Sequence, residues 1–291
     1  MSFDTIGLLG IGEMGSAVAR TLAAHTRVVT TLEGRSDATR ARAEAAGVQD
    51  LGSLAEVVRQ SDLVLSVLAS DTAPAVAAEV ADAARRVEKR VLFGEFNAIA
   101  PVTVHAIANE AADTMDVVDG GIVGGPGNLG SASIYLSGPR AEEVASLREY
   151  GINTVLLGPV VGQASGAKLC HAGMTKGVST LALDILLAAE ALGVADTVMA
   201  QYTRSMAGVL QFVDRFVPGN PKRAYRRAEE MPEIARMLDA LGFDGSIHRA
   251  AYERMRWLGS LELDTDGAPS ASDVARRIVE SMAEAAEQER A

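Results

Sequence analysis

Apolar residues in the first half of the chain form short runs that alternate with longer segments of helical periodicity. The runs TIGLLG (5–10), RVVTTL (27–32) and DLVLSVL (62–68) are typical of buried strands, because they are short and rich in branched residues. Further strands are predicted over 90–96, 115–125 and 131–138, and helices over 13–25, 36–47 and 73–87. This alternation predicts parallel strands joined by crossover helices, which is a doubly wound α/β sheet.

The pattern changes after about residue 160. Residues 162–193 carry no strand signal, and their apolar positions surround a helical axis instead of forming one stripe, which predicts a helix buried among others. Four more helices are predicted over 194–212, 221–241, 246–260 and 270–288, separated by segments rich in glycine and proline. We therefore expect an α/β domain over 1–160 and an all-helical domain over 161–291.

Composition narrows the class of protein. The chain has 291 residues, a net charge of −11 and 48% hydrophobic residues, which suits a globular protein and argues against a nucleic-acid binder. The single cysteine, Cys170, fits a reducing compartment. The N-terminus lacks the basic region of a signal peptide, and no uninterrupted apolar stretch reaches about 18 residues. We expect a cytoplasmic protein with no membrane partner.

A glycine motif follows the first predicted strand. Gly10, Gly12 and Gly15 have the G-x-G-x-x-G spacing, between a strand and a helix, which is the context that gives this motif its meaning. Such a loop turns tightly, lets the pyrophosphate approach the backbone and presents free N–H groups at the helix start. It predicts a Rossmann-type dinucleotide-binding domain. The loop residues expected to contact the cofactor are Gly10, Ile11, Gly12, Glu13, Met14 and Gly15.

The end of the second strand determines which dinucleotide binds, and its signals conflict. Glu33 stands where an acidic residue would bind the ribose hydroxyls of NAD. Arg35 and Ser36, at the start of the next helix, could instead hold the 2′-phosphate of NADP. We expect NADP, with NAD as the second choice.

Four segments together resemble the β-hydroxyacid dehydrogenase superfamily, which includes 3-hydroxyisobutyrate dehydrogenase and 6-phosphogluconate dehydrogenase. They are GLLGIGEMGSAVARTL (7–22), FNAIAP (96–101), DGGIVGGPGNLGS (119–131) and GQASGAKLCHAG (162–173). The chain looks most like a branch whose C-terminal domain is uncharacterised and phosphogluconate-dehydrogenase-like. The resemblance implies an oxidoreductase of CH–OH and C=O groups that uses NADP, acts on a small and anionic substrate, and forms a homodimer.

The resemblance also implies roles for individual residues. Lys168 looks like the catalytic lysine, which would act as general acid and base, and Asn97 looks like the residue that approaches the nicotinamide. Leu68, at the end of a predicted strand, is a further cofactor contact. The catalytic set is completed by His171, and the expected substrate contacts are Val123, Gly124, Gly125, His171 and Lys176.

Two positions depart from the family pattern. Val123 stands where the family usually has serine, and Ala172 where it usually has asparagine. These departures keep C=N reduction, as in imine reductases, as an alternative to C=O chemistry. A nucleotide-binding sensor without turnover is a third possibility, against which the retained Lys168 and Asn97 argue. The spacing of His, Cys and carboxylates predicts no metal site. The basic group at 222–227 is interpreted as a solvated helix face, with an anion-binding wall of the substrate cleft as the alternative.

Overall fold

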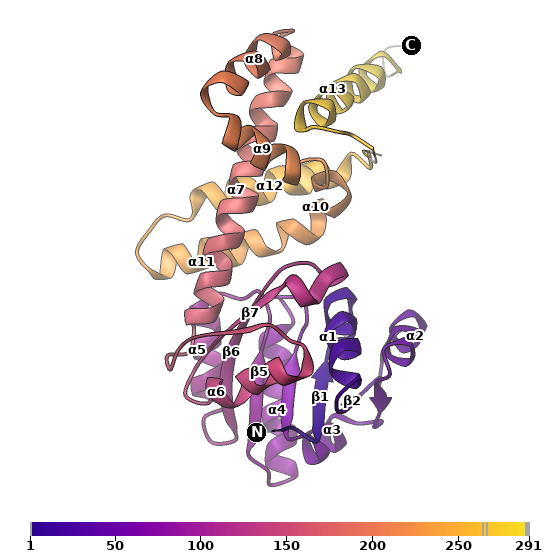
Figure 1. Cartoon of the computed structure of the whole chain (residues 1–291), viewed down its shortest axis with the longest axis vertical. Coiled ribbons are helices and arrows are strands. Elements are labelled where there is room, and N and C mark those ends of the chain that lie inside the picture. The colour runs from indigo at the N-terminus through magenta and orange to yellow at the C-terminus, as the bar shows by residue number, and fades with distance from the viewer. Residues whose placement is uncertain (1, 264, 266, 289–291) are drawn as a thin grey trace. The chain divides into compact units, whose positions relative to one another are not determined.

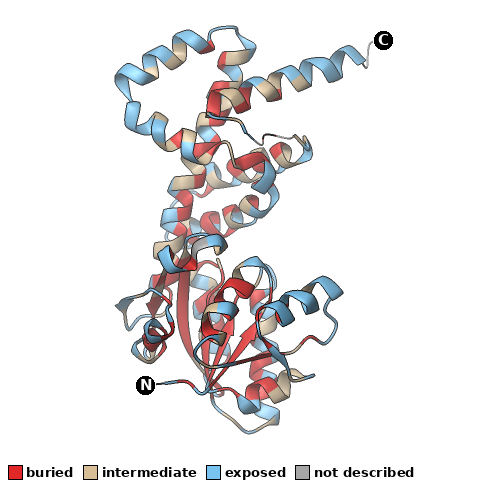
Figure 2. Ribbon diagram, turned by 45° about the vertical axis from the view of Figure 1, so that its right-hand side comes forward, coloured by how far each residue is buried: buried red, intermediate tan, exposed pale blue. Residues whose placement is uncertain are grey.

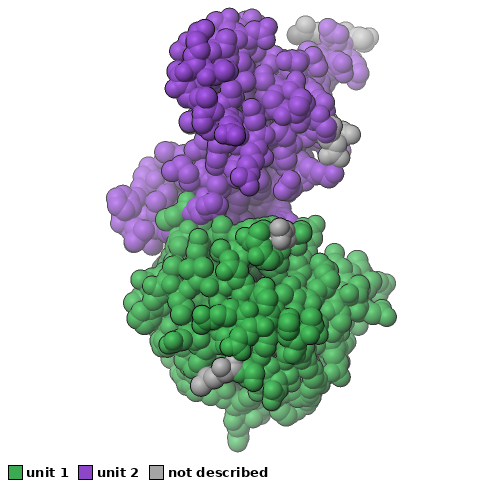
Figure 3. Space-filling view, viewed as in Figure 1, with its two compact units in different colours: residues 1–170 green, residues 171–291 purple. Residues whose placement is uncertain are grey.

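The computed structural model describes residues 2–263, 265 and 267–288. The chain divides into two compact units, Met1–Cys170 and His171–Ala291, which are coloured separately in Figure 3. This division lies ten residues beyond the boundary expected from the sequence, because the long helix that was assigned wholly to the second domain begins within the first unit.

The first unit is built on one mixed sheet (Figure 1). Its strands in the described part of the chain are β1 Thr5–Leu9, β2 Arg27–Thr30, β3 Gln49–Asp50, β4 Leu63–Ser66, β5 Val91–Glu95, β6 Met115–Val123, β7 Ser133–Ser137 and β8 Thr154–Gly158. They lie in the order β3-β2-β1-β4-β5-β6-β7-β8. All neighbours pair in parallel except β6 and β7, which are antiparallel. The predicted doubly wound sheet is confirmed.

Helices cover both faces of this sheet, which explains why its strands are continuously apolar. Side chains of successive residues alternate between the two faces: Leu63 and Leu65 belong to one apolar cluster, and Val64 between them belongs to the other. One face is covered by α1 Glu13–Ala23, α2 Asp37–Ala45 and α6 Ala141–Val144, and the other by α3 Leu54–Gln60, α4 Ala73–Arg86 and α5 Pro101–Glu110. Short 3₁₀ segments span Pro126–Ser131 (η1) and Ala145–Tyr150 (η2).

Several short elements were not predicted. β3 has two residues and β8 is an exposed edge strand, so neither carries a buried apolar run. α3 did leave a local signal, because Ser53 caps it and its hydroxyl accepts a hydrogen bond from the backbone N–H of Glu56 at 3.3 Å. The serine followed three residues later by glutamate could have revealed this helix.

The second unit is helical in the described residues (Figure 2). α7 Gln163–Ala191 begins in the first unit and continues into the second. The others are α8 Ala195–Ser205, α9 Ala207–Phe216, α10 Asn220–Ala228, α11 Glu230–Ala240, α12 Ser246–Ser260 and α13 Ala271–Gln288. Two of the predicted helices were wrong in extent, since 194–212 is divided at Met206 and 221–241 is divided at Glu229, where the helical hydrogen bonding is interrupted.

α7 is long and apolar enough, by length and composition alone, to cross a membrane. A core helix of a soluble protein passes the same test, and 39% of the most apolar window of α7 is buried within the protein. Its polar side chains are also engaged: Lys176 pairs with Glu230 at 2.6 Å, and Asp184 pairs with Arg254 at 2.7 Å. These contacts hold one side of α7 within the second unit, while Leu181 and Ile185 are exposed, so the expected burial on all sides is not observed.

Candidate active site

The glycine loop connects β1 to α1. Gly10 has φ +93°, and a side chain at this position would collide with the backbone of Val67. A side chain at Gly15 would collide with the backbone of Gly10. Gly12 differs, because no described protein atom lies within 4 Å of where its Cβ would be. Gly12 is also the N-cap of α1 and offers no side-chain cap, so the helix start is available to a phosphate. The loop therefore fits a dinucleotide pyrophosphate.

The residues expected to select the cofactor lie after β2. Glu33, Arg35 and Ser36 are all exposed, and Ser36 is the N-cap of α2. The structure adds Arg42, whose Nε donates a hydrogen bond to the carbonyl of Ile11 at 3.1 Å. Arg42 thus joins α2 to the glycine loop, a contact that the sequence did not reveal because the two residues are 31 positions apart.

Four polar side chains form a row across the sheet near the ends of its parallel strands. Ser66 pairs in register with Glu95, Glu95 with Asp119, and Asp119 with Ser137. All four residues are 0% exposed. Buried polar groups of this kind need hydrogen-bond partners, and the partners here lead in two directions. We call Ser66, Glu95, Asp119 and Ser137 the polar row.

At one end, the polar row holds Asn97. The Asn97 Nδ2 donates to Ser66 Oγ at 2.7 Å and to Glu95 Oε1, while its Oδ1 accepts from the backbone N–H of Leu68. Asn97 is only 2% exposed, so its side chain fixes the segment that follows β4. Both amide hydrogens are used within the protein. Contact of Asn97 and Leu68 with a nicotinamide stays a prediction.

At the other end, the polar row holds the start of α7. Asp119 Oδ2 accepts hydrogen bonds from the backbone N–H of Ser165 and from the Ser137 hydroxyl, both at 3.0 Å, and Oδ1 accepts from the Ser165 hydroxyl. The Ser137 hydroxyl accepts from the backbone N–H of Ala164 at 3.0 Å. A carboxylate at this helix end also matches the helix dipole. The first turn of α7 is therefore anchored to β6 and β7.

Lys168 lies one turn further along α7, directly over β6. A Cβ at Gly121 would stand 2.6 Å from the carbonyl oxygen of Ala164 and 2.9 Å from Lys168 Cβ. Only glycine lets the helix approach the strand this closely, and Lys168 is left partly buried beside it. Lys168 and Asp119 thus lie on the same side of β6, and Asn97 lies at the end of neighbouring β5.

Glu95 is a buried acid that the sequence analysis missed. The pKa of Glu95 is raised from 4.5 to about 8, mainly by burial and also by the negative charge of Asp119, while hydrogen bonds from Asn97 and Ser66 oppose the shift. Its Oε2 is buried and has no hydrogen-bond partner in the described part of the chain. A glutamate within the apolar run VLFGEF was the available signal.

A family model describing the NAD binding domain of 6-phosphogluconate dehydrogenase matches residues 5–158. The chain belongs to this family. A second model, a domain of unknown function (DUF1932), matches residues 189–258. Together with the fold, these matches place the protein among β-hydroxyacid dehydrogenases, as its sequence resemblance implied.

Three solved structures illustrate the relationship. A conserved protein of unknown function, structurally similar to 3-hydroxyacid dehydrogenases, is 30% identical with a TM-score of 0.69, over 88% of this chain and 97% of its own. Mycobacterium tuberculosis 3-hydroxyisobutyrate dehydrogenase with L-serine is 19% identical, with a TM-score of 0.71 over 96% and 99% of the chains. A Bacillus cereus imine reductase is 16% identical, with a TM-score of 0.58 over 95% and 99%.

The family and the fold identify the protein as an oxidoreductase of the hydroxyacid dehydrogenase type that binds a nicotinamide dinucleotide. The expected substrate loop follows β6. Val123 is half-buried at the strand end, and Gly124 and Gly125 are exposed. Gly124 has φ +148°, and a Cβ there would stand 2.5 Å from Ala132 Cβ. The backbone path of this loop therefore depends on glycine, whatever it binds.

The remaining candidates belong to the second unit. His171 is exposed on α7. Lys176 is 9% exposed and pairs with Glu230 of α11 at 2.6 Å between Nζ and Oε2, so its charge is compensated within the protein. Substrate contact by either residue stays a prediction. In the basic group, Lys222, Arg223 and Arg226 are exposed, while Arg227 is half-buried and donates to Asn220 Oδ1.

Proposed function

We propose that this dehydrogenase transfers a hydride between NADPH and the carbonyl or hydroxyl carbon of a small, anionic β-hydroxy-acid-like substrate. The observation that carries the proposal is the packing of Lys168 over Gly121. It sets an amine beside the carboxyl ends of the parallel strands, and ligands of doubly wound sheets bind at that edge. Gly121 is two positions before Val123 on β6, so the proposal puts Lys168 close to the loop at 123–125.

The preference for NADP is supported by the positive charge after β2. Arg35 is exposed, Ser36 starts α2, and Arg42 reaches the glycine loop from the same helix. A 2′-phosphate suits two guanidinium groups and a helix start. Glu33 is exposed in the same segment and favours NAD. The Arg35→Ala variant decides between them: it should weaken NADPH far more than NADH in kcat/KM, and an equal effect on both would remove the case for NADP.

The chemistry assigned to the protein is mainly proton transfer. When bound, the cofactor supplies or accepts the hydride. Lys168 Nζ would give a proton to the oxygen of the reduced carbonyl, or take the proton from a substrate hydroxyl in the reverse direction. Backbone N–H groups at Gly124 and Gly125 would bind an anionic group of the substrate. We keep Asn97 and Leu68 as contacts beside the nicotinamide, and His171 and Lys176 as substrate contacts.

The substrate class is supported by the relatives. The bound L-serine of the M. tuberculosis relative and 3-hydroxyisobutyrate itself are both β-hydroxy acids. The test is an NADPH-oxidation screen over small semialdehydes and keto acids, followed by the Lys168→Ala variant on any active compound. The variant should lower kcat by about a hundredfold or more and leave NADPH affinity nearly unchanged.

A control lysine separates catalysis from stability. Lys89 lies in the turn that precedes β5, and its Nζ donates hydrogen bonds to the backbone carbonyls of Arg59 and Ser61. The Lys89→Ala variant should lower stability and keep kcat. If Lys168→Ala turns over as fast as the Lys89→Ala variant, the assignment of Lys168 is wrong.

Imine reduction is the second candidate, because Val123 and Ala172 replace the polar residues that the family usually has. Ala172 is only 6% exposed, so its position offers no polar group in the interior of the second unit. Cyclic imines included in the same screen separate the two chemistries. Tight NADPH binding with no turnover of any compound would instead favour a nucleotide sensor.

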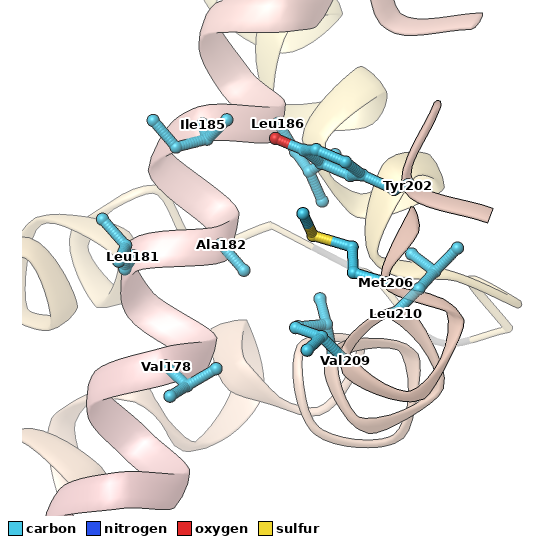
Figure 4. A pocket seen from close by; sticks show the side chains of 10 residues that line it. Val178, Leu181, Ala182, Ile185, Leu186, Tyr202, Met206, Val209 and Leu210 are labelled. Carbon is cyan, nitrogen blue, oxygen red and sulfur yellow. The ribbon is translucent and has the colours of Figure 1, made fainter. Parts of the chain in front are cut away.

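A homodimer through the second unit completes the proposal. α7 exposes Leu181 and Ile185, at 65% and 46% of their surface, and α8–α9 expose Met206 and Val209. Between these helices lies an apolar cavity of about 190 Å³, into which Val178, Leu186 and Tyr202 also project (Figure 4). A second copy would cover this apolar surface. Light scattering should give twice the chain mass, and Leu181→Glu should give monomers.

A further inference from the structure

The polar row contains two groups of hydrogen bonds that are not joined to each other. Asn97 bridges Ser66 to Glu95, and Asp119 is bonded to Ser137 and Ser165. Between Glu95 and Asp119, no hydrogen bond joins the two carboxyl groups. Glu95 Oε1 accepts from the backbone and side chain of Asn97, but Glu95 Oε2 has no donor among the described residues.

The two acids are nevertheless neighbours. Glu95 and Asp119 are registered partners on the parallel strands β5 and β6, and such strands lie about 4.8 Å apart with partner side chains on the same face. Both residues are 0% exposed. Two bare carboxylates in this position would repel each other and would both lose hydration. One proton on Glu95 Oε2 would remove one of these two negative charges, and it would turn the unpartnered oxygen into a hydrogen-bond donor.

We propose that Glu95 is held as a neutral carboxylic acid beside Asp119, and that the Glu95 proton keeps Asn97 and the first turn of α7 in place for cofactor binding. Glu95 is a positioning residue, because it acts through Asn97 and through Asp119. The inference rests on the proposed function only in assuming that the segment held by Asn97 lies against the cofactor. The presence of the proton on Glu95 does not depend on that assumption.

The surroundings of Glu95 explain why the proton stays on. Asp119 of β6 is the charged group that acts on it, and its effect is to raise the Glu95 pKa. The neighbours Ser66 of β4 and Asn97 after β5 are uncharged. Lys168 of α7 packs over Gly121, two positions beyond Asp119. The pKa of about 8 means that Glu95 is neutral at pH 7 and ionises in mildly alkaline solution.

Ionisation should therefore loosen the site. Above a pH of about 8, a second negative charge beside Asp119 would push apart the two strand ends that hold Asn97 and Ser165. NADPH affinity of the wild-type protein should then fall, by at most about tenfold per pH unit for a single proton. In the Glu95→Gln variant the amide keeps a donor at the Oε2 position and cannot ionise, so its affinity should not show this fall.

The binding experiment compares three proteins by NADPH fluorescence titration, from about pH 6 to about pH 9.5. Taking the ratio of variant to wild type at each pH cancels the titration of the cofactor itself. Glu143→Gln is the matched control, since Glu143 is bonded to Arg140 on α6, away from the polar row. It should follow the wild-type profile. An alkaline fall of equal size in Glu95→Gln would overturn the proposal.

A direct measurement covers the case in which Glu95→Gln does not fold. In wild-type protein with ¹³C-labelled glutamate carboxyl groups, one resonance should titrate near pH 8, far above the others. Absence of any glutamate titrating above pH 7 would refute the proton on Glu95. Because neither experiment requires turnover, they remain decisive even if the Lys168→Ala test overturns the proposed function.

Discussion

Replacing Glu95 with glutamine should stabilise the protein at neutral pH and have little effect near pH 5. The folded state binds the Glu95 proton up to a pH of about 8, whereas the ordinary pKa of a glutamate side chain, taken for the unfolded chain, is 4.5. Between these values the folded state holds more protons than the unfolded state, so the free energy of unfolding falls as pH rises. This contribution is fully present below pH 4.5 and is lost once the pH has passed about 8.

The size of the effect follows from the width of that interval. A pH of 7 lies about 2.5 units above the pKa of Glu95 in the unfolded chain. At about 1.4 kcal/mol per unit, the wild-type protein has therefore lost about 3 kcal/mol of unfolding free energy by this pH. At pH 5 the same reasoning gives less than about 1 kcal/mol. Glutamine does not ionise, so Glu95→Gln should exceed the wild type in stability by about 3 kcal/mol at pH 7.

Urea unfolding followed by circular dichroism at several pH values measures this difference. Glu143→Gln again serves as the control, because the Arg140 guanidinium holds the pKa of Glu143 below its usual range. Removing that carboxylate should cost stability at pH 7, which is the opposite sign. A difference between Glu95→Gln and wild type that stays constant from pH 5 to pH 8 would refute the reasoning.

Three further substitutions test other parts of the structure. Gly12→Ala should leave the thermal midpoint unchanged, since no described atom is near its Cβ, and should weaken NADPH at least about tenfold in a fluorescence titration. Gly121→Ala should cost about 1–3 kcal/mol in urea unfolding and lower kcat, because the methyl group meets the Ala164 carbonyl; unchanged kcat would argue against the close packing. Lys176→Met should cost about 3 kcal/mol by removing the ion pair with Glu230, and adding Glu230→Met should recover part of this loss; no recovery would show that the pair is not the cause.

The fold was predictable because its main signals are local. A strand covered on both faces must be continuously apolar, as in LVL at 63–65, so β1, β2, β4 and β5 could be recognised from their composition alone. The glycine loop was predictable for the same reason, because its strand, turn and helix are consecutive. Edge strand β8, with exposed Leu156 and Leu157, depends instead on its pairing with β7.

The polar row could not be predicted in the same way. Consecutive members of the row are 18 to 29 positions apart along the chain, and only the register of the sheet makes them neighbours. A partial signal exists: Ser66, Glu95 and Ser137 each close an apolar strand with a polar residue. Such a pattern indicates a polar edge, but it does not reveal which side chains become neighbours there.

The polar row connects two parts of the site that the sequence motifs present separately, namely Asn97 and the helix that carries Lys168. The resemblance assigns Asn97 to the cofactor and Lys168 to proton transfer, as though these were separate parts. In the structure, Asn97 is bonded to Glu95, and the helix that carries Lys168 is bonded through Ser165 to Asp119. Since Glu95 and Asp119 are registered neighbours, whatever moves one strand end moves the other. The position of Asn97 and the first turn of the helix that carries Lys168 therefore both depend on side chains of the polar row, and we expect a substitution in this row to alter both.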